Sequence, residues 1–287
     1  MAATGGGGDP PAVCTDNETV PWGVDRVGAR ANTTAGVGDG TCGNGPDGAT
    51  IYVLDTGSTS KDLHVVDHRN YMWGPNKDCN GHGTHVAGTA AAIDNGTDVI
   101  GVAPGAPVVA LKVLGCDGTG PYSGIIAAVD YVAGLPVNNR IVNMSLGGPP
   151  STALDNAIRN VVEDGVFFAL AAGNSNADAC NYSPARVGVD LEGAVTVGAT
   201  TRSDSKASFS NHGDCVELWA PGAGIESLAL NGGTSIKSGT SMATPHVAGG
   251  AALWLTNHNG GPDKAEEALR SLAKTSPAGP LLDVSNY

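Results

Sequence analysis

The sequence predicts a single-domain α/β protein in which a mainly parallel central sheet carries helices on both faces. Short apolar, β-branched runs alternate along the chain with longer runs of helical character, which is the pattern of βαβ units. No Ser/Pro-rich linker, charge block or internal repeat divides the 287 residues into two domains. A hydrophobic content of 41% with 15% charged residues is that of an ordinary globular protein.

The predicted elements follow in order along the chain. Residues 1 to about 21 are expected to form a loose N-terminal arm, and residues 22–287 the domain. Short apolar runs predict strands at Ile51–Asp55, Val108–Val113, Ile141–Met144, Val166–Ala171 and Val195–Gly198. Longer runs predict helices at His82–Ala92, Tyr122–Val132, Leu154–Glu163, Met242–Thr256 and Pro262–Ala273. The last of these helices has Pro262 near its start and Lys274 just after its end.

Charge and hydropathy exclude two classes of partner. The net charge of -13 argues against nucleic acid, because proteins that bind it need basic patches. No apolar run approaches the roughly 18 residues of a membrane-spanning helix. The first eight residues lack a basic end and an apolar core, so no signal peptide is expected there.

One serine lies where a nucleophile would be expected. Ser241 follows a flexible Gly239-Thr240 approach and begins an apolar segment that reads as a buried helix. The first amides of such a helix would stabilise a negatively charged oxygen. A serine is a weak nucleophile without a base, so this run predicts a base and an orienting carboxylate elsewhere.

Both partners have candidates upstream. Asp55 ends a predicted central strand, where open α/β sheets place their sites. His82 lies at the start of a predicted helix and His85 one turn further in, so either is a candidate base. An isolated aspartate of this kind is as compatible with a turn cap, and Ser241 with a helix cap. The chain order Asp, His, Ser is that of subtilisin and differs from the orders in chymotrypsin and the α/β-hydrolases.

Three blocks of sequence resemble the active-site blocks of subtilisin-like serine proteases. They are Tyr52-Val53-Leu54-Asp55-Thr56-Gly57, Gly81-His82-Gly83-Thr84-His85-Val86-Ala87-Gly88-Thr89 and Gly239-Thr240-Ser241-Met242-Ala243-Thr244-Pro245-His246-Val247-Ala248-Gly249. Further similarity occurs at Val142–Gly148, Ala171–Asn174 and Phe209–Asn211. The resemblance runs from about Trp22 to the C-terminal helix and implies the subtilisin-like three-layer sandwich.

The resemblance assigns roles to four residues. It implies that Ser241 is the nucleophile, that His82 rather than His85 is the base, and that Asp55 orients His82. His246 and the other histidines are then structural. Asn174 would complete an oxyanion hole with the Ser241 N–H, although an isolated Gly-Asn is more often a turn. Removing such a donor costs about 10²–10³ in turnover in a subtilisin, a size taken over from that relative.

The resemblance also implies a peptide-binding cleft. Two segments match those that hold an extended peptide as an added strand, namely Gly118-Thr119-Gly120 and Ser145-Leu146-Gly147-Gly148. For Gly118–Gly120 alone, an ordinary loop is an equally good interpretation. The pocket before the cut would be bounded by Ser145–Gly148 and Ala171–Gly173, which contain no charge, so apolar or aromatic side chains are expected there. Tyr122 and Ile125 resemble the rim of a second apolar pocket.

Six cysteines indicate an oxidised, exported protein, because no zinc-binding spacing occurs among them. Sequence alone permits 15 pairings. The contexts resemble those of the proteinase K and aqualysin branch, which implies Cys79–Cys116 and Cys180–Cys215 and leaves Cys14–Cys42. No cofactor is expected for catalysis. Structural calcium is a weaker expectation, because Glu217 stands where relatives have a ligand aspartate, and its ligands are left unassigned.

The leading hypothesis is therefore a secreted serine endopeptidase of broad specificity. Its expected partners are protein and peptide substrates and an inhibitory propeptide during maturation, and a monomer is the default for the family. A non-catalytic peptide-binding protein is the second hypothesis, although such a protein would not need all four site residues. An esterase of the α/β-hydrolase kind is the third, but Ala243 replaces the last glycine of its Gly-x-Ser-x-Gly motif.

Overall fold

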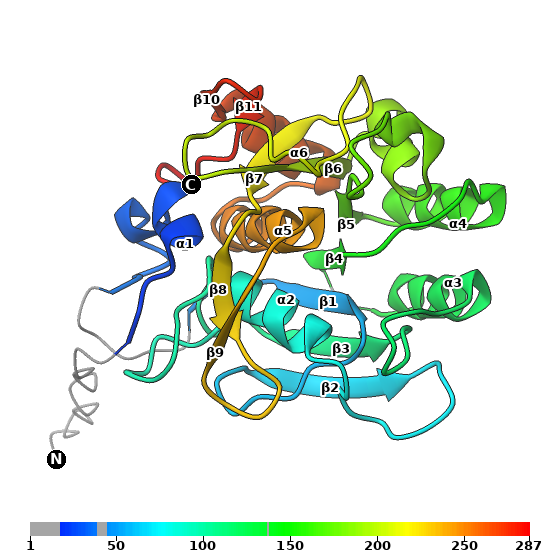
Figure 1. The fold of residues 1–287 in the computed structure, drawn as a ribbon, viewed down its shortest axis with the longest axis horizontal. Helices are drawn as coiled ribbons and strands as arrows, with labels where there is room; N and C mark the ends of the chain where they lie inside the picture. Colours follow the sequence, from blue (N-terminus) through cyan, green and yellow to red (C-terminus); the bar gives the residue numbers. More distant parts are fainter. Residues whose placement is uncertain (1–17, 39–44, 137) are drawn as a thin grey trace, which may run out of the picture.

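One nine-stranded sheet runs through the molecule. The structure is a computed structural model and describes residues 18–38, 45–136 and 138–287. Across these residues the sheet order is β10-β11-β7-β6-β5-β4-β1-β3-β2 (Figure 1). All neighbouring strands are parallel except β10 and β11, so the predicted mainly parallel sheet is confirmed.

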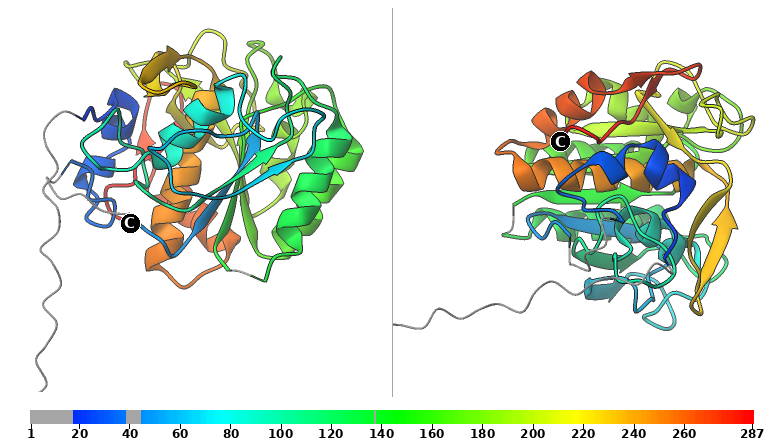
Figure 2. Two further views of the ribbon diagram at one scale, coloured as in Figure 1. Left: turned by 90° about the horizontal axis from the view of Figure 1, so that it is seen from below. Right: turned by 90° about the vertical axis from the view of Figure 1, so that its left-hand side faces the viewer.

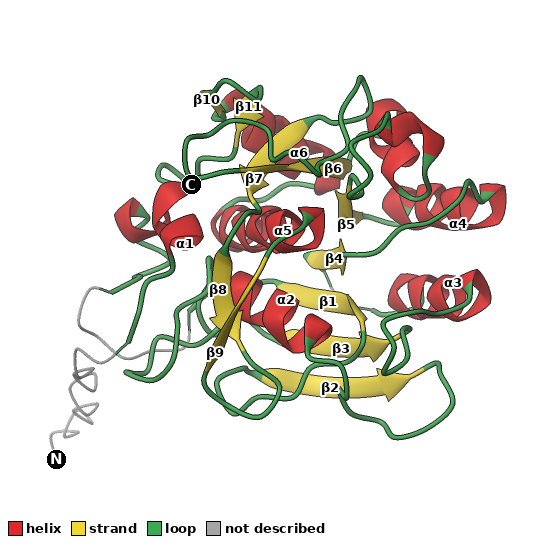
Figure 3. Cartoon of the chain, viewed as in Figure 1, coloured by secondary structure: helices red, strands yellow, loops and turns green. Residues whose placement is uncertain are grey.

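The strands of this sheet are short and mostly buried. Their bounds are β1 Thr50–Asp55, β2 Val65–Asn70, β3 Val108–Lys112, β4 Arg140–Met144, β5 Val166–Ala171, β6 Ala194–Thr200, β7 Leu218–Pro221, β10 Lys274–Thr275 and β11 Pro280–Leu281. A separate antiparallel ribbon is made by β8 Ile225–Leu228 and β9 Thr234–Lys237. Figure 3 shows this ribbon outside the main sheet, beside α2.

Helices cover both faces of the sheet. Their bounds are α1 Trp22–Arg26, α2 His82–Ala91, α3 Tyr122–Ala133, α4 Thr152–Glu163, α5 Thr240–Asn257 and α6 Pro262–Ser271. Short 3₁₀ turns lie at Ala29–Ala31, Ala179–Asn181 and Ala185–Asp190. Figure 2 shows the resulting three layers, with α2, α5 and α6 on one side of the sheet and α3 and α4 on the other. No helix within the described ranges is long and apolar enough to cross a bilayer.

Successive side chains of a strand point to opposite faces, and this alternation builds two cores. On β1, Ile51 and Val53 pack with α2 and α5, whereas Tyr52 and Leu54 pack with α3 and α4. Helix α5 is the central helix of its layer and is buried from Met242 to Leu255. Gly83 of α2 lets this layer approach closely, since a Cβ there would stand 2.0 Å from the Gly57 carbonyl oxygen.

The order in which strands are added to the sheet changes sides at β1. Strands β3 and β2 lie on one side of β1, and β4 to β7 lie on the other. The loops that leave the carboxyl ends of β1 and β4 therefore diverge and open a crevice between them. The residues after these strand ends, together with the starts of α2 and α5, surround that crevice.

All five predicted strands and all five predicted helices are present, with ends shifted by a few residues. The last helix ends at Ser271 and not at Ala273, because the chain turns there into β10. Five described segments had no prediction, namely α1, strand β2, strand β7, the β8–β9 ribbon and the β10–β11 pair. The N-terminal arm is described only from Glu18, and there Thr19 forms a parallel bridge with Val99.

Candidate active site

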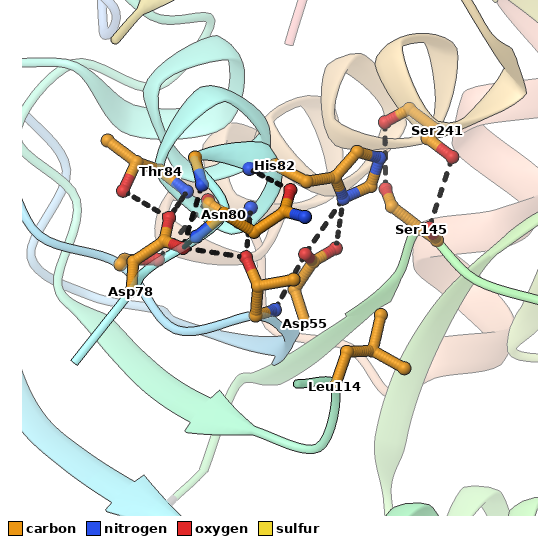
Figure 4. Close-up of polar contacts among 12 residues, drawn as sticks. Asp55, Asp78, Asn80, His82, Thr84, Leu114, Ser145 and Ser241 are labelled. Atoms are coloured by element: carbon orange, nitrogen blue, oxygen red, sulfur yellow. Dashed lines mark hydrogen bonds and ion pairs between the residues drawn. The ribbon is translucent and has the colours of Figure 1, made fainter. Parts of the chain in front are cut away.

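Asp55 and His82 form a buried carboxylate–imidazole pair. His82 Nδ1 lies 2.8 Å from Asp55 Oδ1 and 2.9 Å from Oδ2. The Asp55 side chain is fully buried, and its Oδ1 also accepts the Thr56 N–H at 2.7 Å. Because an ionised carboxylate only accepts hydrogen bonds, Nδ1 carries the proton. The other ring nitrogen, Nε2, is therefore free to accept a proton on the side of Ser241 (Figure 4).

A second aspartate holds the start of α2. Asp78 Oδ1 accepts hydrogen bonds from the N–H groups of Asn80 and Gly81 and from the Thr56 hydroxyl. Its Oδ2 accepts the N–H and the hydroxyl of Thr84, so Asp78 caps the helix from outside it (Figure 4). Burial raises the pKa of Asp78, but these hydrogen bonds outweigh it and leave the pKa below its ordinary value. Asp78 thereby fixes the turn that presents His82.

The environments of the histidines separate the candidate base from the others. Burial lowers the pKa of His82, but the charge and hydrogen bond of Asp55 outweigh it and raise the pKa above its ordinary value. Burial lowers the pKa of His85 to about 4, and its Nε2 faces the carbonyl oxygens of Ile225 and Ser235, both at 3.1 Å. His246 is fully buried, with its pKa also lowered to about 4. Neither has a carboxylate partner like that of His82.

Ser241 lies in the first turn of α5 and faces the same crevice. Its hydroxyl donates to the Ser145 carbonyl oxygen at 3.1 Å, and the Ser145 hydroxyl donates to the Ser241 carbonyl oxygen at 2.8 Å. Figure 4 shows the His82 ring between Asp55 and Ser241. The Ser241 N–H belongs to the first turn, where amides have no acceptor within the helix.

Asn174 follows β5 and is held against α5 by one end of its amide. Its Oδ1 accepts the N–H of Thr240 at 2.8 Å and the Thr240 hydroxyl at 3.1 Å. This orientation leaves the Nδ2 donor available. A Cβ on Gly239 would stand 3.5 Å from Asn174 Nδ2 and 3.6 Å from the Ser241 nitrogen, so both donors lie close to the same point beside Gly239.

Two connected hollows adjoin these residues. The larger has a volume of about 500 Å³ and is lined by Asn80, His82, Leu114, Gly118, Thr119, Gly120, Tyr122, Ile125, Ser145, Leu146, Gly147, Gly148, Pro149, Asn174 and Ser241. The smaller, of about 180 Å³, is lined by Leu146, Gly147, Gly148, Ala171, Ala172, Gly173, Asn174, Ser175, Tyr182, Asn211, Thr240 and Ser241. No residue lining the smaller hollow carries a charge. At its wall, Gly173 has φ +100°, and a Cβ there would meet Asn211 Nδ2 at 2.4 Å.

The structure therefore brings the proposed site residues together. Asp55, His82, Asn174 and Ser241 meet at the crevice, and every predicted peptide-binding residue lines one of the two hollows. Residues 46–283 match the family described as the subtilase family. The chain belongs to the subtilase family.

Other subtilases match most of this chain. It is 46% identical over 279 residues to alkaline serine exoprotease A of Vibrio alginolyticus, covering 93% of this chain and 49% of that protein. The extracellular serine proteinase of Thermus sp. (strain Rt41A) is 44% identical over 82% of this chain and 56% of its own length. The chain thus spans about half of these relatives. The crystal structure of a cold adapted subtilisin-like serine proteinase matches with a TM-score of 0.80 and 42% identity, covering 93% of this chain and 98% of that one.

Two of the predicted disulfides of this subtilase are present. Cys79 is bonded to Cys116, and Cys180 to Cys215. The first joins the loop before α2 to the segment that precedes Gly118. The predicted pair Cys14–Cys42 lies outside the described residues.

Glu217, which stands where relatives have a calcium-binding aspartate, has protein partners. The Glu217 side chain is only 6% exposed, its Oε1 pairs with Arg270 at 3.2 Å, and its Oε2 accepts the Thr196 N–H at 3.2 Å. Burial, with the nearby charge of Glu266, raises the pKa of Glu217 to about 7. Across the described part of the chain, no group of three or more His, Cys, Asp and Glu side chains is arranged to hold a metal ion. Calcium stays a prediction.

Three contributors to this site were not predicted from the sequence. Asp78 caps α2, Thr240 orients Asn174, and the charge of Lys237 on β9 acts on His82. Asp78 carries a recognisable signal, because an aspartate shortly before a helix start is a common cap. Thr240 and Lys237 carry none, since their roles depend on how β5 and β9 pack beside α5.

Proposed function

We propose that this subtilase domain is a serine endopeptidase that cleaves peptide bonds through an acyl-enzyme on Ser241. The observation that carries the proposal is the buried Asp55–His82 pair with its free Nε2 turned to the Ser241 hydroxyl. In the resting arrangement that hydroxyl donates to the Ser145 carbonyl. A rotation about the Cα–Cβ bond of Ser241 turns it to His82, and such contacts often tighten only with substrate.

The chemistry follows from the donors and acceptors in place. The Ser241 oxygen attacks the peptide carbonyl while His82 Nε2 takes the hydroxyl proton, and Asp55 stabilises the imidazolium that forms. The carbonyl oxygen becomes negative and accepts hydrogen bonds from the Ser241 N–H and from Asn174 Nδ2. His82 then protonates the departing amine, which leaves an ester on Ser241. Water, deprotonated by His82, hydrolyses that ester and restores the hydroxyl.

The larger hollow suits an extended peptide. The segments Gly118–Gly120 and Ser145–Gly148 border it from two sides, so a peptide between them would add a strand through main-chain hydrogen bonds. The side chain before the cut would enter the smaller, uncharged hollow. We infer a broad specificity that favours apolar or aromatic side chains there, with Tyr122 and Ile125 bordering a second apolar subsite.

The setting of this activity is also a proposal. The cysteine contexts resemble those of the proteinase K and aqualysin branch, and this resemblance supports assigning the domain to that branch. Two disulfides favour an oxidising compartment. We infer a secreted monomer that is released from an inhibitory propeptide. The name of the Thermus relative, an extracellular proteinase, supports the location.

Labelling with a peptidyl organophosphonate tests the activity directly. We expect covalent labelling of the wild-type chain and none of Ser241→Ala. Ser238→Ala serves as the matched control, because Ser238 lies three residues earlier and accepts only the Gly224 N–H. A well-folded wild-type chain that takes up no label would refute the proposal and favour a non-catalytic peptide-binding role.

Cleavage-site profiling on a peptide library then tests specificity. Apolar and aromatic residues should predominate before the cut, and a preference for charged residues there would contradict the proposed pocket. Repeating the profile and a thermal melt with a calcium chelator tests the predicted metal dependence.

A further inference from the structure

A proline inside α5 removes one hydrogen bond from the turn that carries Ser241. In an α-helix the N–H of residue 245 would donate to the carbonyl of residue 241. Residue 245 is proline, which has no N–H, so the Ser241 carbonyl oxygen has no donor within the helix. An unpaired buried carbonyl is costly, and another donor is therefore expected.

Ser145 supplies that donor from a neighbouring strand. Its hydroxyl lies 2.8 Å from the Ser241 carbonyl oxygen (Figure 4). Ser145 directly follows β4, and it is 2% exposed. The Asn143 side chain, fully buried on β4, donates to the same hydroxyl from Nδ2 at 3.0 Å. These two hydrogen bonds connect the sheet, through Ser145, to the first turn of α5.

We propose that Ser145 is a positioning residue, whose hydroxyl replaces the bond lost at Pro245 and so fixes Ser241 for the reaction. The inference rests on the proposed function. It adds to the expected peptide-binding role of Ser145, which uses only the main chain and would survive loss of the hydroxyl.

The Ser145 hydroxyl matters because the first turn of α5, which it holds, carries two groups that act in the proposed reaction. The Ser241 oxygen and the Ser241 N–H move together with the Ser241 main chain, while His82 and Asn174 are held on other elements. The same turn is also held at Thr240, whose N–H donates to Asn174 Oδ1. Loss of the Ser145 bond frees one side of the turn, and a displacement of about 1 Å at such a site costs roughly 10²-fold in rate.

The first test is Ser145→Ala. We expect kcat on a short peptide substrate to fall by about tenfold to hundredfold, with KM changed by less than about twofold. A loss confined to KM would instead indicate a substrate contact and would overturn the proposal.

The decisive test restores the missing donor. Pro245→Ala supplies an N–H four residues after Ser241, which can donate to the orphaned carbonyl. The double variant Ser145→Ala/Pro245→Ala should therefore recover most of the kcat lost in Ser145→Ala when compared with Pro245→Ala alone. If instead the losses of kcat in the two single variants multiply in the double variant, so that their free-energy costs add, the proposal is refuted.

A matched control separates this bond from general packing. Ser227 is also buried, and its hydroxyl donates to a helix carbonyl, that of His85, at 2.8 Å. The residue four positions after His85 is Thr89 and not a proline, so no main-chain donor is missing there. Pro245→Ala should not rescue any defect of Ser227→Ala. Rescue there as well would show a non-specific effect and count against the proposal.

Thermal melts of the wild type, Ser145→Ala, Pro245→Ala and the double variant distinguish this proposal from the proposed function. Ser145→Ala should lower the melting temperature, and Pro245→Ala should reduce that loss, whether or not the chain turns over substrate. A wild-type chain that neither labels nor cleaves refutes the proposed function only. If the changes in melting temperature of the two single variants simply add in the double variant, the hydrogen bond from Ser145 does not hold the turn, and the present proposal is refuted.

Discussion

The pKa of His82 is set by its burial and by nearby charges of both signs. Burial opposes the imidazolium, Asp55 favours it, and the charge of Lys237 on β9 opposes it again. Asp55 prevails, and the pKa of His82 lies above its ordinary value. Since only neutral His82 can accept the serine proton, activity should rise as the pH increases through that pKa.

Lys237→Met removes one of the opposing charges. The pKa of His82 should rise further, so the acidic limb of the pH profile of kcat/KM should shift to higher pH. On that limb the variant should be slower than wild type at each pH, and on the alkaline plateau the two should agree. Lys61→Met is the control, since it makes the same charge change at an exposed residue that does not act on His82. An unshifted limb in Lys237→Met would contradict the electrostatic account.

Asn174→Ala removes one proposed oxyanion donor. We expect kcat to fall by about 10²–10³, the size known for a subtilisin, with little change in KM. Asn138→Ala is the control, because Asn138 is an exposed asparagine away from both hollows that form the site. A fall in kcat of less than about threefold in Asn174→Ala would remove this residue from the mechanism.

Residues within motifs could be predicted from the sequence, whereas those that act through packing could not. Asp55, His82 and Ser241 each lie in a block whose composition suits one role, and the structure gathers them at one crevice. Lys237 and Thr240 act only because distant elements bring them there. The bond from Ser145 to Ser241 escaped prediction for the same reason, although Pro245 was visible in the sequence.

At the scale of elements, the start of α2 is held by a buried charged side chain, that of Asp78. Asp78→Asn should lower the free energy of unfolding by about 2–4 kcal/mol near pH 7, because hydrogen bonds to a buried charge are lost. The pKa of Asp78 is lowered in the fold, so its contribution is present above the unfolded pKa and disappears as pH falls through the folded pKa. The difference between variant and wild type should therefore shrink in acid.

Denaturant titrations at several pH values measure this difference. The control is Asp178→Asn, since Asp178 is exposed and caps only the short turn Ala179–Asn181. That change should cost about 1 kcal/mol or less. A pH-independent loss in Asp78→Asn would contradict the assignment of its charge.

The elements themselves differ in how clearly the sequence encodes them. Strands β1, β3, β4, β5 and β6 are apolar because both of their faces are buried, and all were predicted. Strand β2 lies at the sheet edge and carries Asp67, His68 and Arg69, so it has no apolar run. The β8–β9 ribbon had a usable signal in Asn231-Gly232, a dipeptide typical of hairpin turns, which the prediction overlooked.

At the scale of the molecule, two disulfides close loops of similar length. Cys79–Cys116 spans 37 residues and Cys180–Cys215 spans 35. Replacing either pair by serine should lower the free energy of unfolding by about 4 kcal/mol, because the unfolded chain gains similar freedom in both cases. Unfolding should be measured in a Ser241→Ala background, which prevents self-digestion. A loss below about 1 kcal/mol would contradict this.

The two disulfides should differ in their effect on activity. The first ties the loop before α2 to the segment leading to Gly118–Gly120, so its removal should also lower kcat/KM. The second lies beyond the smaller hollow and should affect chiefly stability. Equal effects on kcat/KM would contradict this distinction.

The burial of α5 has a consequence for when the activity can arise. Helix α5, which carries the proposed nucleophile, is the most buried helix of its layer, and along the chain it follows all of the strands from β1 to β7. A nascent chain that stops before α5 lacks both the Ser241 hydroxyl and the central helix of that layer. The proposed activity therefore requires that α5 has been synthesised and has packed against a sheet whose central strands precede it in the sequence.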